Sequence, residues 1–149
     1  MKTVEIYTDG ACLHNPGPGG WGAILRFNGR EKEMFGGESQ TTNNRMELSA
    51  VIFALESLKE PCTVLLYSDS QYICNALTLG WAKKWRANGW MRNKKEKALN
   101  PDLWERLLNL CQKHDVQPIW VKGHAGHPEN ERCDTMASTA AAWYAGQRR

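Results

Sequence analysis

Apolar and polar residues alternate at the start of the chain. Within residues 3–8, side chains point in turn to a more apolar and a more polar face, as in a strand half buried in a sheet. Two more short strands are expected at residues 21–27 and 31–35, because Asn28 and Gly29 between them form a strong tight-turn dipeptide. The chain therefore begins with a meander of three antiparallel strands.

The next segment has the spacing of an amphipathic helix. Its apolar residues recur every three or four positions, at Leu48, Val51, Ile52, Leu55 and Leu58. Asn44 followed three residues later by Glu47 has the form of a capping box, which marks the start of a helix. A helix is therefore expected over about residues 45–59.

Strands and helices alternate in the rest of the chain. Residues 64–67 are continuously apolar, as in a strand covered on both faces, and residues 119–121 form a last short strand. Helices are expected at about residues 70–79, 101–111 and 131–145. This order predicts that all 149 residues form a single α/β or α+β domain with a mixed sheet.

Positive charge is concentrated in one segment, residues 81–97. Its seven basic residues, against the single acid Glu96, are Lys83, Lys84, Arg86, Arg92, Lys94, Lys95 and Lys97. The whole chain carries only +3, so the rest of it is acidic, and this asymmetry indicates an anionic partner. Trp81, Trp85 and Trp90 are interleaved with the basic residues. Trp81 and Trp85 lie one helical turn apart, so a packing stripe beneath a solvated lysine face is the alternative.

The cysteines and the longest apolar runs indicate the cellular compartment in which the protein is expected. The cysteines are five in number, show no CxxC spacing and follow no secretory signal, so we expect reduced thiols in the cytoplasm. No apolar run approaches the roughly 18 residues of a membrane span, so no span is expected.

Gly17, Gly19 and Gly22 match the GxGxxG pattern of a dinucleotide-binding loop. In that motif the third glycine opens a helix that holds a pyrophosphate. Here the following residues, 21–27, read as a strand, so the motif lacks its required context. These glycines are instead expected to form a connecting turn.

Two apolar strands each lead to an aspartate, Asp9 and Asp69. If the strands are parallel neighbours, both carboxylates lie at the same edge of the sheet, where ligands usually bind. Adjacent carboxylates repel unless a cation neutralises them, so this pair indicates a metal site. The alternatives are a turn residue at Asp9 and a helix cap at Asp69.

Two further acids, Glu47 and Asp134, have ordinary explanations as well. Glu47 fits the capping box, and Asp134 fits the favourable placement of acids in the first turns of a helix. A site with four carboxylates would suit Mg²⁺ or Mn²⁺, which prefer oxygen ligands.

His124, His127 and Cys133 lie close together in the sequence and raise a zinc alternative. Their spacing matches no standard zinc finger, and Cys133 falls in an alanine-rich helix where a small core residue is expected. A histidine on a glycine-rich loop beside an acidic site is better suited to proton transfer.

Five motifs, in order along nearly the whole chain, resemble type 1 ribonuclease H. They are "YTDGACLHNPGPGGWGAI", "TTNNRMELSAVIFALESL", "YSDSQYI", "WAKKWRANGW" and "WVKGHAGHPENERCD". The resemblance implies a mixed five-stranded sheet with helices on both sides. It also implies a monomeric endonuclease that hydrolyses the RNA strand of an RNA/DNA hybrid and needs Mg²⁺, with Mn²⁺ as a substitute, at one or two ions per site.

The resemblance also implies roles for individual residues. The metal-binding acids fall on Asp9, Glu47, Asp69 and Asp134, and the mobile histidine falls on His124. Candidate contacts to the hybrid lie on loops near the acids, at Cys12, Asn15, Asn43, Asn44 and Gln71, and on the basic segment, at Trp81, Lys83, Lys84, Trp85, Arg86 and Trp90. Cleavage with two divalent ions is expected to leave 3′-hydroxyl and 5′-phosphate ends.

Two alternatives to this function are a hybrid-binding module without turnover and a related nuclease that cuts DNA, such as a junction resolvase or an integrase core. The complete set of four acids with His124 argues against a binding module. The asparagine-rich loops and the segment of tryptophan and lysine favour the hybrid-specific enzyme over the DNA nucleases.

Overall fold

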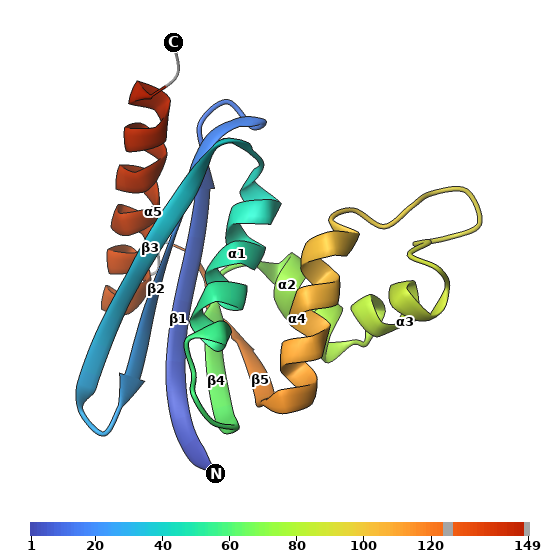
Figure 1. Ribbon diagram of the computed structural model, residues 1–149, viewed down its shortest axis with the longest axis horizontal. Coiled ribbons are helices and arrows are strands. Elements are labelled where there is room, and N and C mark those ends of the chain that lie inside the picture. The colour runs from blue at the N-terminus through green and yellow to red at the C-terminus, as the bar shows by residue number, and fades with distance from the viewer. Residues whose placement is uncertain (124–126, 148–149) are drawn as a thin grey trace.

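A five-stranded mixed sheet runs through the molecule (Figure 1). The computed structural model describes residues 1–123 and 127–147. The strands are β1 (Lys2–Cys12), β2 (Gly17–Phe27), β3 (Arg30–Thr41), β4 (Cys62–Ser68) and β5 (Asp115–Trp120), in the spatial order β3-β2-β1-β4-β5. The first three are antiparallel, and β4 pairs in parallel with both β1 and β5. The predicted meander and mixed sheet are confirmed.

Helices cover both faces of the sheet (Figure 1). They are α1 (Asn43–Glu56), α2 (Gln71–Thr78), α3 (Trp81–Ala87), α4 (Pro101–Lys113) and α5 (Pro128–Gly146). A side chain at Gly19 would meet Met46 of α1, whereas one at the next residue, Gly20, would meet Ala140 of α5, so these helices lie on opposite faces. Among the described residues, no helix has both the length and the apolar character needed to cross a membrane.

The main core lies between the sheet and α1, with α4 packed beside α1. Ile6, Val64 and Leu66 from the two central parallel strands are fully buried against α1 residues such as Leu48 and Ile52. Burying each such side chain contributes roughly 1.5–3 kcal/mol. This burial therefore stabilises the two central strands up to the edge of the sheet where Asp9 and Asp69 lie.

The helix caps differ from the predicted ones. The Thr42 side-chain oxygen accepts a hydrogen bond from the Arg45 backbone N–H at 3.2 Å, so α1 begins earlier than expected and the proposed capping box of Asn44 and Glu47 is wrong. Ser70 caps α2 by accepting from the Ile73 backbone N–H at 3.2 Å, so the helix-cap alternative for Asp69 is wrong too. Both acids are thereby left without a capping role.

The glycines of the GxGxxG match lie in β2 and not in a connecting turn, which occupies only residues 13–16. The reason is close packing, because α5 runs directly over this strand. A Cβ atom at Gly20 would lie 2.6 Å from the Ala141 backbone nitrogen, and one at Gly22 would lie 2.7 Å from the Cys133 carbonyl oxygen. Glycine therefore permits a helix backbone to approach the strand backbone.

Candidate active site

Asp9 and Asp69 lie at the same edge of the sheet, as expected from the parallel pairing of β1 and β4. The last paired residues of these strands are Thr8 and Ser68, so the two aspartates follow side by side. Asp9 does not end its strand, however, because β1 continues to Cys12 and Asp9 pairs with Gly22 of β2. The turn alternative for Asp9 is therefore wrong.

Glu47 reaches this edge because α1 crosses β1 at very short range. A Cβ atom at Gly10 would lie 2.5 Å from the Glu47 backbone nitrogen, so only glycine leaves room for the helix there. The Gly10 N–H also donates to Asp9 Oδ1 at 2.9 Å, which orients that carboxylate. Gly10 is not among the candidate residues from the sequence, although a glycine directly after Asp9 could have indicated a close approach of two backbones.

Asp9, Glu47 and Asp69 form a compact group of carboxylates, with one oxygen of each lying within 4.8 Å of the others. Asp9 is 7% exposed and Glu47 is 9% exposed. Burial, reinforced by the charge of Asp69, raises the pKa of Asp9 to about 7. Burial and the charge of Asp9 raise the pKa of Glu47 well above its usual range. Glu47 Oε2 is buried with no hydrogen-bond partner among the described residues.

These properties fit a divalent cation. The donor set consists of hard oxygen ligands, and the crowding that raises both pKa values is relieved when a cation neutralises the carboxylates. Within the described part of the chain, Glu47 Oε2 is a buried acceptor that receives no hydrogen bond. No other combination of His, Cys, Asp and Glu in residues 1–123 and 127–147 has the spacing of metal ligands.

Asp134 lies nearby on α5 and is half-buried. Its charge contributes to the raised pKa of Asp9, but its carboxylate is not part of the group of three within 4.8 Å. The neighbouring Cys133 is fully buried, and its thiol donates to the Tyr7 carbonyl at 3.4 Å, as expected of a small core residue. His127 is exposed ahead of α5, and His124 lies outside the described residues.

Trp120 has a second role that the sequence pattern does not indicate, since the pattern predicts only a short strand there. Its indole N–H donates to the Asp69 backbone carbonyl at 3.1 Å. The next residue, Val121, donates its N–H to the Ser68 carbonyl at 2.9 Å. The end of β5 is thereby attached to the segment that carries Asp69, and no spacing in the sequence signals this contact.

The candidate loop contacts are tied together near the start of α1. The Cys12 thiol donates to the Thr41 carbonyl at 3.4 Å, and Asn15 Oδ1 accepts from the Asn43 backbone N–H at 3.1 Å. Asn44 is half-buried in the first turn of α1, whereas Gln71 is exposed at the start of α2. Cys12 and Asn15 therefore attach the loop to the end of β3 and to the start of α1.

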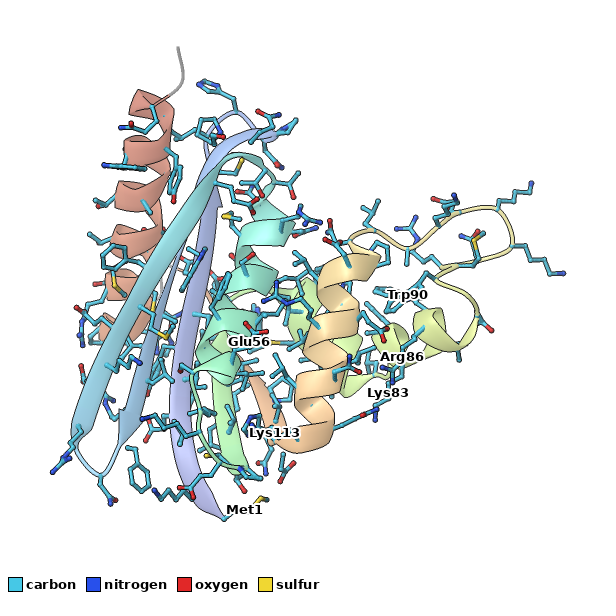
Figure 2. The ribbon with its side chains drawn as sticks, viewed as in Figure 1. Met1, Glu56, Lys83, Arg86, Trp90 and Lys113 are labelled. Carbon is cyan, nitrogen blue, oxygen red and sulfur yellow. The ribbon has the colours of Figure 1, made fainter. Side chains whose placement is uncertain are left out.

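The basic segment forms α3 and the long loop after it, which project beyond α4; Figure 2 shows Lys83, Arg86 and Trp90 there. Trp85 is only 8% exposed and packs against the rings of Tyr72 and Trp104. The packing alternative is therefore confirmed for Trp85, which the sequence grouped with the direct substrate contacts. Trp81 is 40% exposed, and Lys83 and Lys84 are exposed.

The known proteins that this chain resembles in sequence belong to one family. The RNase H family model matches residues 1–142. The chain is 66% identical over 141 residues to Ribonuclease H of Desulforamulus reducens, covering 95% of this chain and 89% of that protein. It is 59% identical over 140 residues to Ribonuclease HI of Synechocystis sp., covering 93% of this chain and 88% of that protein.

Solved structures share the fold. The crystal structure of LC9-RNase H1, a type 1 RNase H with the type 2 active-site motif, superposes with a TM-score of 0.84 at 32% identity, covering 96% of this chain and 74% of that one. LC11-RNase H1, solved in complex with RNA/DNA hybrid, superposes with a TM-score of 0.73 at 21% identity over 94% of this chain and 97% of that one. With its carboxylate group and the match along its length, the chain belongs to the ribonuclease H family.

Proposed function

We propose that this chain hydrolyses the RNA strand of RNA/DNA hybrids by divalent-metal-dependent phosphodiester cleavage, leaving 3′-hydroxyl and 5′-phosphate ends. Its membership of the ribonuclease H family supports a ribonuclease acting on hybrids. The observation that carries the metal dependence is the group formed by Asp9, Glu47 and Asp69, with oxygens within 4.8 Å of one another. Glu47 Oε2 in this group is buried and has no hydrogen-bond partner in residues 1–123 and 127–147.

In this proposal Asp9, Glu47 and Asp69 hold the metal, and Asp134 lies outside this group of ligands. Bound Mg²⁺, or Mn²⁺ in its place, would activate the attacking water and stabilise the leaving oxygen. Asp9 belongs to the group of three, and its raised pKa supports the need for a neutralising cation there. Glu47 and Asp69 complete the ligand set from α1 and from the end of β4, and Asp134 adds negative charge from α5.

Choice of RNA requires contact with the 2′-hydroxyl across the wide minor groove of an A-like duplex. Cys12, Asn15, Asn43, Asn44 and Gln71 are the proposed contacts, because they lie at the loop and the helix starts next to the acids. On the basic segment, Trp81, Lys83, Lys84, Arg86 and Trp90 would hold the DNA strand through phosphate charge and ring contacts. Trp85 would support these residues from the core.

Other expectations from the sequence stay predictions. They are proton transfer or product departure assisted by His124, a monomeric state, and a cytoplasmic location. Of these, the role of His124 is open to direct measurement: His124→Ala is expected to lower the cleavage rate without weakening hybrid binding.

A side-by-side cleavage assay tests the proposal. Labelled RNA/DNA hybrid, duplex RNA and duplex DNA are incubated with the protein in Mg²⁺, in Mn²⁺ and in a chelator, and the product ends are mapped. Cleavage of the hybrid RNA strand alone, lost in the chelator, is expected. Asp9→Asn is the matched variant, because it removes one charge and keeps the side-chain shape; it is expected to abolish cleavage and retain hybrid binding. Full activity of Asp9→Asn, or cleavage in the chelator, would contradict the metal assignment.

A further inference from the structure

An ion pair joins the first turns of α1 and α4. The Arg45 guanidinium donates to both carboxylate oxygens of Asp102, from Nη1 at 3.0 Å and from Nη2 at 2.8 Å. These hydrogen bonds hold the pKa of Asp102 below its usual range, so the pair is charged at neutral pH. Two parallel hydrogen bonds between a guanidinium and a carboxylate define their relative orientation as well as their distance. The first turn of α1 therefore has a defined position next to that of α4.

Arg45 also reaches the loop between α3 and α4, residues 88–100, which we call the basic loop. Its Nη1 donates to Asn100 Oδ1 at 3.2 Å. Asn100 precedes α4 with a left-handed backbone, at φ 57°, and within the described part of the chain its side chain makes no cap bond to that helix. Asn100 is the last residue of the basic loop, so Arg45 connects α1 directly to the end of this loop.

The basic loop is tied to itself near its base. The Ala98 N–H donates to the Trp90 carbonyl at 2.9 Å, and Met91 and Lys97 form an isolated β-bridge. Because the two sides of the loop are joined, a bond at Asn100 bears on the position of the whole loop. The loop carries four of the seven basic residues of the basic segment, namely Arg92, Lys94, Lys95 and Lys97.

The same turn of α1 belongs to the surface around the carboxylates. Arg45 lies two residues before Glu47 and directly after Asn43 and Asn44, which are proposed contacts to the hybrid. A short nucleic-acid duplex is stiff, so it meets two separate surfaces at once only if their spacing matches its width. The distance from the carboxylate group to the basic loop should therefore affect hybrid affinity.

We propose that Arg45 is a positioning residue for hybrid binding, which holds the basic loop at the distance from the carboxylate group that an RNA/DNA duplex spans. The inference rests on the proposed function. It gives Arg45 no contact with the metal or the hybrid, since its guanidinium is engaged by Asp102 and Asn100. Loss of the link weakens hybrid binding and leaves metal binding and the cleavage step unchanged.

A second ion pair between the same two helices provides the matched control. Arg106 of α4 donates to Glu56 Oε1 at 2.8 Å and to Glu56 Oε2 at 3.0 Å, at the last residue of α1; Figure 2 labels Glu56. The Arg106 guanidinium also lies over the Phe53 ring of α1, 5.4 Å from its centroid. These contacts join α1 to α4 without the basic loop. Both ion pairs are partly exposed, so each contributes little to stability.

Steady-state cleavage of an RNA/DNA hybrid compares the parent chain with three variants. At about 0.1 M salt, Arg45→Met is expected to raise KM about tenfold, as for loss of one phosphate contact, and to leave kcat within about twofold. Arg106→Met removes the same charge from the other pair and is expected to leave both constants within about twofold. Asp102→Ala adds one net positive charge, which by itself would tighten binding to phosphates. It is nevertheless expected to raise KM several-fold, because Arg45 loses its anchor.

Mg²⁺ affinity, measured by calorimetry, and urea unfolding are followed in the same variants, and the Mg²⁺ affinity is expected to stay within about twofold of the parent. An unchanged or lower KM in Asp102→Ala would show that Arg45 acts through its own charge and would overturn the proposal. Equal rises in KM for Arg45→Met and Arg106→Met, or a fall in Mg²⁺ affinity that matches the rise in KM, would overturn it too. A parent chain that cleaves no hybrid would overturn the proposed function as well, whereas these results in variants of an active parent contradict the positioning role alone.

Discussion

The indole N–H of Trp120 donates to the Asp69 backbone carbonyl at 3.1 Å, which fixes the end of β5 to the residue that follows β4. Because the bond is to the backbone, Trp120 is a positioning residue and does not itself bind metal. The backbone at Gly123 lies close to the Asp69 carboxylate, since a Cβ atom there would lie 3.1 Å from Oδ2. The segment after β5 therefore contacts the Asp69 backbone at one end and approaches its carboxylate at the other.

Trp120→Phe removes that hydrogen bond and keeps most of the ring. We expect Mg²⁺ affinity, measured by titration calorimetry, to fall by up to about tenfold, as for one lost hydrogen bond. Trp143→Phe is the control, because Trp143 is 59% exposed on α5 and its ring packs against Tyr144. Equal Mg²⁺ affinity in both variants would show that Asp69 needs no support from Trp120.

Gly10→Ala places a Cβ atom 2.5 Å from the Glu47 backbone nitrogen. Helix α1 or strand β1 must shift to accommodate it, so we expect a loss of about 1–3 kcal/mol in the free energy of unfolding together with weaker Mg²⁺ binding. Urea unfolding and calorimetry measure the two effects. Gly146→Ala is the control, since no atom lies within 4 Å of its added Cβ. If Gly10→Ala unfolds like the wild type, the contact between α1 and β1 is looser than described.

The stability of the metal-free protein is expected to depend on pH through Asp9. Its pKa is raised from 3.8 to about 7 in the folded state, so the folded state binds more protons than the unfolded state between these values. The stability that protonated Asp9 contributes is therefore complete at low pH and is lost as the pH rises through about 7. Asp9→Asn should be more stable than the wild type at pH 8, by up to about 4 kcal/mol, and should lose that advantage near pH 4.

Unfolding of both proteins in a chelator, followed across this pH range, measures the difference directly. Saturating Mg²⁺ is expected to restore the wild type at pH 8 and to have a smaller effect on Asp9→Asn. An advantage of Asp9→Asn that is the same at every pH would mean that the carboxyl group titrates normally in the folded state.

The basic segment is expected to contribute to hybrid affinity through phosphate contacts. Each basic residue that neutralises a phosphate adds about one to the slope of log affinity against log salt. Replacing Lys83, Lys84 and Arg86 by alanine should therefore lower the slope by about three, while Lys32, Lys59 and Lys113 replaced together serve as a charge-matched control. Binding is measured with Asp9→Asn as the background so that the hybrid stays intact. A slope unchanged by the first triple substitution would refute this role.

The order of the strands and of α1, α2, α4 and α5 followed from periodicity, but α3 was not among the expected helices and several boundaries differed. Residues 45–59 had the right spacing for a helix, yet the cap is Thr42, because several neighbouring side chains carry a suitable oxygen and only the backbone geometry selects one. Strand β1 runs past Asp9 because its pairing with β2 continues after β4 has ended. Such lengths depend on neighbouring strands, which local sequence does not specify.

The candidate site was predictable only in part, for the same reason. Asp9 and Asp69 each follow an apolar strand, and parallel pairing was enough to bring them together. Glu47 joins them because Gly10 lets α1 lie close to β1, a contact between segments far apart in the sequence.

The contact of α5 with the glycines of β2 has a consequence for Asp134. At Gly20 and Gly22 the helix rests on the strand main chain, and Asp9 is the residue paired with Gly22 across to β1. The separation between the helix that carries Asp134 and the strand that carries Asp9 is therefore set by two backbones in contact. Side chains elsewhere on α5 can be exchanged, at some cost in stability, while this spacing stays the same.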